Sequence, residues 1–127
     1  MALPSSSHRV LAGLNVLVVE DEAIISFLLE DTLGDLGAAQ VRVAANVAAA
    51  LALVEARVPD LAVLDVNLGG ERAYPIAERL EAAGVPFVFT TGYGRSGMDP
   101  RWAHKTVVQK PFTSEILSAA LATAIAR

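Results

Sequence analysis

The sequence contains no cysteine among its 127 residues. That absence excludes disulfides, thiolate nucleophiles and thiolate-bound metals, and it fits a reducing, cytoplasmic compartment. Basic residues are also scarce, because 10 Lys and Arg stand against 14 Asp and Glu, for a net charge of −4. A protein that neutralises nucleic-acid phosphates needs the opposite balance. We therefore expect no direct binding of nucleic acid.

Long apolar runs are missing too. The longest uncharged stretch, Ala82–Gly94, has 13 residues, whereas a membrane span needs about 20. We expect no membrane association. With 54% hydrophobic residues, the chain is instead expected to form one globular domain, since a typical domain has about 150 residues. Residues 1–13 lack the apolar core of a signal peptide and predict a flexible N-terminal tail before a domain at residues 14–127.

Short apolar runs alternate with helical patterns along the remaining chain. The runs that predict strands are residues 15–19, 40–44, 61–65, 87–91 and 106–110. Apolar spacing and capping residues predict helices at about 25–37, 47–57, 75–83 and 114–126. Strands without polar alternation must be buried on both faces, so the fold class is an α/β three-layer sandwich with a five-stranded parallel sheet. Between the last two strands, glycines and Pro100 leave space for only a short or disordered fourth helix.

Polar side chains follow four of these strands at the point where each ends. Glu20 and Asp21 follow the first strand, Asp65 ends the third, Thr91 ends the fourth, and Lys110 ends the fifth. The carboxyl ends of parallel strands face one crevice in a doubly wound sheet. We therefore expect three carboxylates, one hydroxyl and one ammonium to meet there.

Three neighbouring carboxylates repel one another unless a cation or raised pKa values relieve the repulsion. An all-oxygen ligand set favours Mg²⁺, with Mn²⁺ as a substitute. We expect Asp21 and Asp65 to be direct ligands, Glu20 to hold a metal-bound water, and the backbone carbonyl of Asn67 to complete the set. With Lys110 also screening the charge, one carboxylate can attack phosphorus, and Asp65 is the expected acceptor.

Four segments carry a family resemblance: VLVVEDE (16–22), LAVLDVNLGG (61–70), TTGYG (90–94) and KPF (110–112). They resemble the signature blocks of the receiver domains of two-component response regulators, from about residue 15 onward. The resemblance implies a flavodoxin-like fold with strand order 2-1-3-4-5, Asp65 as phospho-acceptor, Glu20 and Asp21 as the acidic pair for Mg²⁺, Thr91 as switch hydroxyl and Lys110 as its ion-pair partner. It also implies a cis bond before Pro111.

The stretch PFVFTTGYG (86–94) resembles a narrower branch, the FATGUY receivers of bacterial general-stress signalling, which are partnered by HWE-type histidine kinases. The position three before the lysine, commonly an aromatic that rotates on activation, is Val107. The usual coupling of threonine to an aromatic therefore cannot operate. We expect Tyr93, or ordering of residues 92–103, to replace it.

The resemblance implies a Mg²⁺-dependent receiver that takes a phosphoryl group from a sensor histidine kinase or phosphotransfer protein, and then signals to a downstream protein by a conformational switch. Beyond self-phosphorylation and autodephosphorylation, no enzyme activity is expected. Phosphorylation-dependent dimerisation stays open. Two alternatives remain: a phosphatase similar to the haloacid dehalogenases, whose nucleophilic Asp ends the first strand, and a pseudo-receiver scaffold that takes no phosphate.

Several residues allow a plain structural interpretation. Ile24 and Phe27 lie off the apolar stripe of the first helix, so they are either buried or a docking surface for a kinase helix pair. His8 and His104 are expected on the surface, since neither has metal-ligand spacing. Trp102 and Met98 are expected to pack over the end of the sheet.

Overall fold

The structure is a computed structural model that describes residues 10–92 and 98–126. The strands of its main sheet are β1 (Asn15–Val19), β2 (Gln40–Ala44), β3 (Leu61–Asp65), β6 (Phe87–Thr91) and β7 (Val107–Gln109). The helices in this part of the chain are α2 (Ala23–Asp35), α3 (Val47–Ala56), α4 (Tyr74–Ala82) and α5 (Ser114–Ile125), with a 3₁₀ turn, η2, at Pro100–Trp102. Each strand and helix predicted from the sequence is therefore present within a few residues of its expected bounds.

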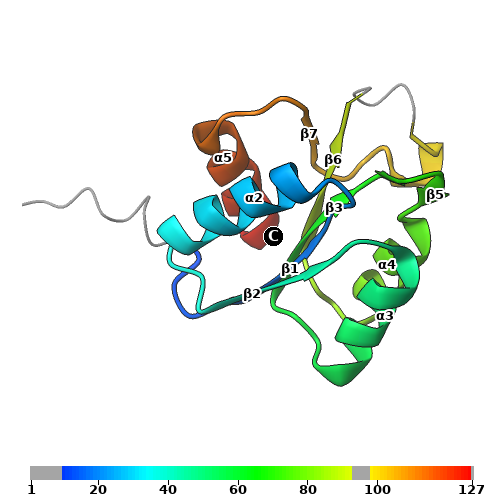
Figure 1. Ribbon diagram of the computed structural model, residues 1–127, viewed down its shortest axis with the longest axis horizontal. Coiled ribbons are helices and arrows are strands. Elements are labelled where there is room, and N and C mark those ends of the chain that lie inside the picture. The colour runs from blue at the N-terminus through cyan, green and yellow to red at the C-terminus, as the bar shows by residue number, and fades with distance from the viewer. Residues whose placement is uncertain (1–9, 93–97, 127) are drawn as a thin grey trace, which may run out of the picture.

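The main sheet is parallel throughout, with the order β2-β1-β3-β6-β7. This confirms the predicted order 2-1-3-4-5 and the α/β three-layer architecture. Helices α2 and α5 cover one face of the sheet, and α3 and α4 cover the other (Figure 1). Over residues 10–92 and 98–126, the helices are all too short or too polar to span a bilayer.

Alternation along the central strands divides the core into two halves. Val18 and Val63 pack on the α2–α5 side, whereas their neighbours Leu17 and Leu64 pack on the α3–α4 side. All five residues of β3 are buried. The central strands are therefore apolar on both faces, as a parallel sheet between two helical layers requires.

Capping side chains set where two helices begin. The Asn46 side chain accepts a hydrogen bond from Ala49 N at 2.8 Å at the start of α3, and Thr113 Oγ1 accepts one from Ile116 N at 3.1 Å at the start of α5. Such caps satisfy backbone donors that the first helical turn leaves without partners. The cap of α5 also fixes the chain a few residues after Lys110, next to the carboxyl end of the sheet.

The structure differs from the sequence prediction at two places. The packed domain begins before residue 14, because Leu11 is fully buried against the α2–α5 side and its N–H donates to Leu36 O at 3.0 Å. Residues 67–72 form a two-stranded hairpin, β4 (Asn67–Leu68) and β5 (Glu71–Arg72), where the sequence predicted no strand. In the described part of the segment between β6 and β7, the short turn η2 agrees with the prediction of a short fourth helix. Tyr93 and His8 lie outside the described residues.

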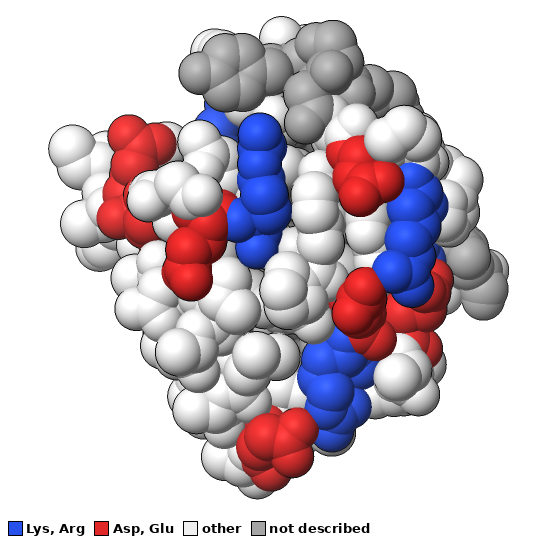
Figure 2. All heavy atoms as spheres, turned by 90° about the vertical axis from the view of Figure 1, so that its right-hand side faces the viewer, with Lys and Arg blue, Asp and Glu red and all other residues white. Residues whose placement is uncertain are grey.

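Ion pairs tie together the elements of the α3–α4 side. They join α3 to α4, α4 to η2, and α4 to the residues after η2: Arg79–Glu55 at 2.9 Å, Arg101–Glu78 at 2.6 Å and Lys105–Glu81 at 3.4 Å. Figure 2 shows basic and acidic side chains beside one another on this face of the molecule. The visible face therefore has no broad basic patch among its described residues.

Candidate functional site

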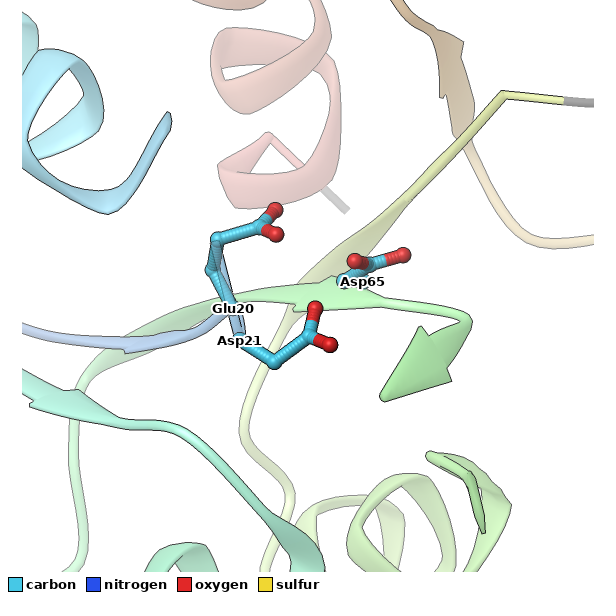
Figure 3. A group of neighbouring side chains, drawn as sticks. All are labelled: Glu20, Asp21 and Asp65. Atoms are coloured by element: carbon cyan, nitrogen blue, oxygen red, sulfur yellow. The ribbon is translucent and has the colours of Figure 1, made fainter. Parts of the chain in front are cut away.

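Three carboxylates meet at the carboxyl end of the sheet. Glu20 and Asp21 follow β1, and Asp65 is the last residue of β3. One carboxylate oxygen from each lies within 4.8 Å of the others, and Figure 3 shows the side chains turned toward a common space. Glu20 and Asp65 are buried, at 2% and 6% exposure, whereas Asp21 is exposed. The cluster is therefore open to solvent on the side of Asp21.

Lys110 brings the one ammonium of the cluster. Its Nζ donates to Glu20 Oε1 at 2.9 Å and to Asp65 Oδ2 at 3.1 Å. Its backbone N–H donates to Thr91 O at 2.8 Å, and the Lys110–Pro111 peptide bond is cis, as the family resemblance implied. The ammonium thus joins carboxylates from β1 and β3 although Lys110 follows β7, at the edge of the sheet.

The β4–β5 hairpin holds Asp65 from the other side. Asn67 N donates to Asp65 Oδ1 at 3.2 Å, and the Asn67 side chain accepts from Gly70 N at 3.1 Å. Gly69, with φ +62°, approaches closely, since a Cβ there would lie 3.4 Å from Asp21 Oδ2. The pair Gly69-Gly70, which follows the strand-end carboxylate by a few residues, is a sequence signal for such a close backbone approach.

Burial dominates the electrostatics of Glu20. It raises the pKa of this carboxyl from 4.5 to about 7, and the charge of Asp65 acts in the same direction, against the Lys110 hydrogen bond. For Lys110, burial lowers the pKa, but hydrogen bonds to Glu20 and Asp65 outweigh it, so the pKa is raised above its usual value. Lys110 is therefore a stable cation, and the cluster without metal is short of positive charge.

Thr91 ends β6 beside this cluster and is 5% exposed. The structure thus brings together Glu20, Asp21, Asp65 and Lys110 and places Thr91 on the next strand, where its backbone carbonyl meets Lys110 N. Asn67 lies next to the cluster through its backbone N–H. Sequence reasoning predicted this set because each strand changes from apolar to polar at its carboxyl end.

Behind the site, aromatic rings belong to the core cluster against which Val107, the residue three before Lys110, packs. Trp102 is 1% exposed and its ring stacks on Tyr74, with centroids 6.4 Å apart and planes at 7°. It also contacts Phe87 and Phe89. Tyr74 Oη accepts a hydrogen bond from Asp99 N at 2.9 Å. Trp102 and Met98 are thus core residues, as expected, and His104 is exposed.

One face of α2 next to the site is uncovered. Ile24 is 76% exposed and Phe27 is 68% exposed. The interpretation that these two residues are buried is therefore wrong. A groove of about 530 Å³ runs beside this face, between α2 and the start of α5, and reaches the site through Lys110. Phe112 and Leu28 are among the residues that line it.

Comparisons with known proteins agree with this geometry. The family model described as the response regulator receiver domain matches residues 16–122. The sensory transduction protein LytT of Bacillus subtilis is 35% identical over 86 residues, which cover 63% of this chain and 34% of that protein. The chain therefore spans about a third of the length of this curated relative.

Two solved structures extend the similarity to nearly the whole chain. The solution structure of SdrG from Sphingomonas melonis Fr1 has 44% identity and a TM-score of 0.80, and covers 93% of this chain and 98% of that one. The receiver domain of PhyR from Erythrobacter litoralis has 28% identity and a TM-score of 0.74, with 90% and 91% covered. The fold is thus the flavodoxin-like receiver fold. None of these comparisons supports the phosphatase or the phosphate-independent scaffold.

Proposed function

Because this chain belongs to the response regulator receiver family, we propose that it accepts a phosphoryl group on Asp65 from a phosphohistidine of a sensor histidine kinase or phosphotransfer protein. One observation carries the proposal. The Asp65 carboxylate, 6% exposed, has an ammonium 3.1 Å from Oδ2 and two further carboxylates beside it. That arrangement fits phosphoryl transfer through an acyl phosphate intermediate.

Asp65 is the best placed of the three carboxylates to attack. Glu20 is buried, and its raised pKa means that it is partly protonated near neutral pH. Asp21 is exposed, but Lys110 contacts Glu20 and Asp65 instead. Both oxygens of Asp65 are oriented, one by Asn67 N and the other by Lys110 Nζ.

In the proposed step an Asp65 oxygen forms a bond to phosphorus while the bond from phosphorus to the histidine nitrogen breaks. The electron pair of the broken bond returns to the imidazole, which leaves as a neutral group because its other ring nitrogen carries a proton. Lys110 balances the negative charge that gathers on the phosphoryl oxygens, and the Thr91 hydroxyl donates to one of them. Hydrolysis later regenerates the carboxylate, so the domain is a phosphorylated switch and not a turnover enzyme.

The acidic cluster fits Mg²⁺, with Mn²⁺ as a substitute. Its donors are carboxylate oxygens, and the three carboxylates share a single ammonium, that of Lys110. Asp21 and Asp65 would be direct ligands, Glu20 would hold a metal-bound water, and the carbonyl of Asn67 would complete the set. A bound divalent cation would neutralise charge on the transferring phosphoryl group.

The uncovered face of α2 is the proposed docking surface for the kinase. Ile24 and Phe27 are exposed, and Lys110 lines the groove beside this face, so a helix pair seated there would place its phosphohistidine near Asp65. The FATGUY resemblance of residues 86–94 favours an HWE-type kinase in the cytoplasm. A change at Thr91 would then alter the surface offered to a downstream protein partner, or to a second copy of the domain.

Acetyl phosphate provides the test without a kinase. Incubation with Mg²⁺ should add one phosphoryl group to the intact protein, as seen by mass spectrometry, and mild base should remove it. Asp65→Asn should abolish the labelling, whereas Asp35→Asn, an exposed carboxylate at the end of α2, should leave it unchanged. Labelling that survives in the Asp65 variant, or its absence in the unaltered protein, contradicts the proposal.

A further inference from the structure

Thr90 is a buried hydroxyl without a partner. The residue is 0% exposed, and Oγ1 has no hydrogen-bond partner among the residues that the structure describes. A buried polar group left without a hydrogen bond destabilises the folded state. Valine has almost the same shape, favours strands equally and lacks the penalty. The hydroxyl therefore calls for a role outside packing.

Thr90 lies on the reactive face of the sheet. Its neighbour two residues earlier, Val88, packs on the α2–α5 side, and alternate residues of a strand share a face. Asp65 shares that face with Val63 by the same rule. In the register of β3 and β6, Asp65 and Thr90 are direct Cα partners. The Thr90 and Asp65 side chains therefore lie side by side.

The side chain of Lys110 must cross β6 at this point. Lys110 follows β7, and β6 separates β7 from β3 in the sheet. Val108, two residues before Lys110, is the register partner of Thr90. Since Lys110 Nζ nevertheless reaches Asp65 at 3.1 Å, its methylene chain passes over the end of β6 on the face that carries Thr90.

Phosphorylation changes what surrounds this ammonium. The contacts with Glu20 and Asp65 use two of its three N–H groups. When an Asp65 oxygen becomes the bridging oxygen of an acyl phosphate, the carboxylate charge moves to the phosphoryl group. Lys110 must then shift its contacts, and Thr90 Oγ1 is an uncommitted acceptor beside its path.

We propose that Thr90 is a positioning residue for Lys110: its Oγ1 accepts a hydrogen bond from the Lys110 ammonium as Asp65 is phosphorylated, and so directs the ammonium to the phosphoryl oxygens. The inference rests on the proposed function of Asp65. It assigns Thr90 no contact with the phosphoryl group and no covalent step. A purely packing role makes a different prediction, because valine would then replace threonine without effect on Lys110.

Two variants separate these roles. Thr90→Val removes the hydroxyl and keeps the shape, whereas Thr90→Ser keeps the hydroxyl and removes a methyl group. We expect Thr90→Val to slow phosphorylation by acetyl phosphate by about three- to tenfold, the effect of one lost hydrogen bond, although its unfolding midpoint in urea is not lowered. Thr90→Ser should keep a rate within about twofold of the original. Thr90→Ala, which lacks the hydroxyl, should be as slow as Thr90→Val.

The sequence allows Lys110 to be observed directly, because Lys105 is the only other lysine. With ¹⁵N-labelled lysine, the two ammonium groups give two nuclear magnetic resonance signals, and Lys105 is the internal control. Mg²⁺ with beryllofluoride, a phosphoryl mimic, should shift the Lys110 signal alike in the unaltered protein and in Thr90→Ser. In Thr90→Val the shifted signal should differ and exchange its protons faster.

The two proposals fail in different ways. If the unaltered protein is not labelled on Asp65 by acetyl phosphate, both are overturned. If it is labelled but Thr90→Val matches it in phosphorylation rate and in the Lys110 signal, only the role of Thr90 is overturned. Slowing in Thr90→Ser equal to that in Thr90→Val also overturns it, since the hydroxyl would then be irrelevant.

Discussion

On the α3–α4 side of the sheet, aromatic rings and ion pairs cover the strands, whereas on the α2–α5 side the same strands end in charged and polar groups. Phe89 contacts Trp102 on the first side, while Thr90, the next residue, faces the second, and its Oγ1 has no hydrogen-bond partner among the described residues. Similarly, Leu64 is core and Asp65 is the proposed acceptor. Because successive residues of a strand face opposite sides of the sheet, a core residue and a residue of the site stand next to each other in the sequence.

This difference separates the part of the molecule that stabilises the fold from the part that destabilises it. Trp102 and its aromatic neighbours bury large apolar surfaces, which stabilise the domain and fix the segment after η2. The carboxylate cluster opposes folding, because Glu20 is buried with a pKa of about 7 and has Asp65 as a neighbour. The α3–α4 side is therefore the stable half of the molecule, and it offsets the cost of the α2–α5 side, which is arranged to bind ligands. Three variants test this division, from the largest expected effect on stability to the smallest.

Replacing Trp102 with alanine should have the largest effect. We expect Trp102→Ala to lower the free energy of unfolding by about 3–5 kcal/mol, because it removes a buried ring that contacts Tyr74, Phe87 and Phe89. Urea unfolding followed by circular dichroism measures this loss. Arg101→Ala, which removes an exposed ion pair with Glu78, should cost about 1 kcal/mol or less. A loss below about 1 kcal/mol for Trp102→Ala contradicts the assignment of the stable half.

The Glu20 carboxyl predicts an unusual dependence of stability on pH. Its pKa is raised to about 7 in the folded protein from 4.5, so the folded state binds the proton more tightly than the unfolded state does. The contribution of this proton to the stability of the folded state is fully present below pH 4.5 and is lost as pH rises through about 7. Without metal, the protein should therefore be more stable near pH 5 than near pH 8, by about 1–3 kcal/mol.

Glu20→Gln is the control for this prediction. Glutamine has nearly the same shape and no titrating proton, and its single amide oxygen can keep one of the two hydrogen bonds that Glu20 accepts from Lys110 and Glu22 N. In a chelating buffer, this variant should therefore lose the decline in stability between pH 5 and 8. Mg²⁺ should bind the unaltered protein more tightly as pH rises through about 7, because it displaces the Glu20 proton. An unchanged pH profile in Glu20→Gln assigns the titration to another group.

The site was more predictable than its surroundings, for physical reasons. Asp65 and Glu20 are abrupt changes from apolar to charged at strand ends, and parallel topology brings such ends together whatever the loops do. The β4–β5 hairpin escaped prediction because strands of two residues have no periodicity. The orphan hydroxyl of Thr90 escaped because a threonine in a strand is ordinary until its hydrogen-bond partners are known. Leu11 was assigned to the tail because polar residues precede it, although it packs beside Leu36.

A substitution on the exposed face of α2 should have the smallest effect on stability and should change only the reaction with the kinase. Helix α2 is apolar around most of its surface, so its sequence did not reveal which residues are covered. Because Phe27 is 68% exposed, we expect Phe27→Ala to change the free energy of unfolding by no more than about 0.5 kcal/mol. Labelling by acetyl phosphate should be unchanged, since Asp65 and Lys110 are intact. Transfer from an autophosphorylated histidine kinase should slow by about tenfold or more, as loss of an aromatic anchor implies.

Ile125 provides the matched control for this last comparison. It is also an exposed apolar residue, at 37%, but lies at the end of α5 and lines a different groove from the one beside Phe27. Ile125→Ala should leave both the labelling and the kinase reaction unchanged. Equal slowing of the kinase reaction in both variants would show that exposed apolar surface in general, and not the face of α2, determines docking. Slowing in Phe27→Ala alone would place the docking surface on the reactive half of the molecule, beside the carboxylates that it serves.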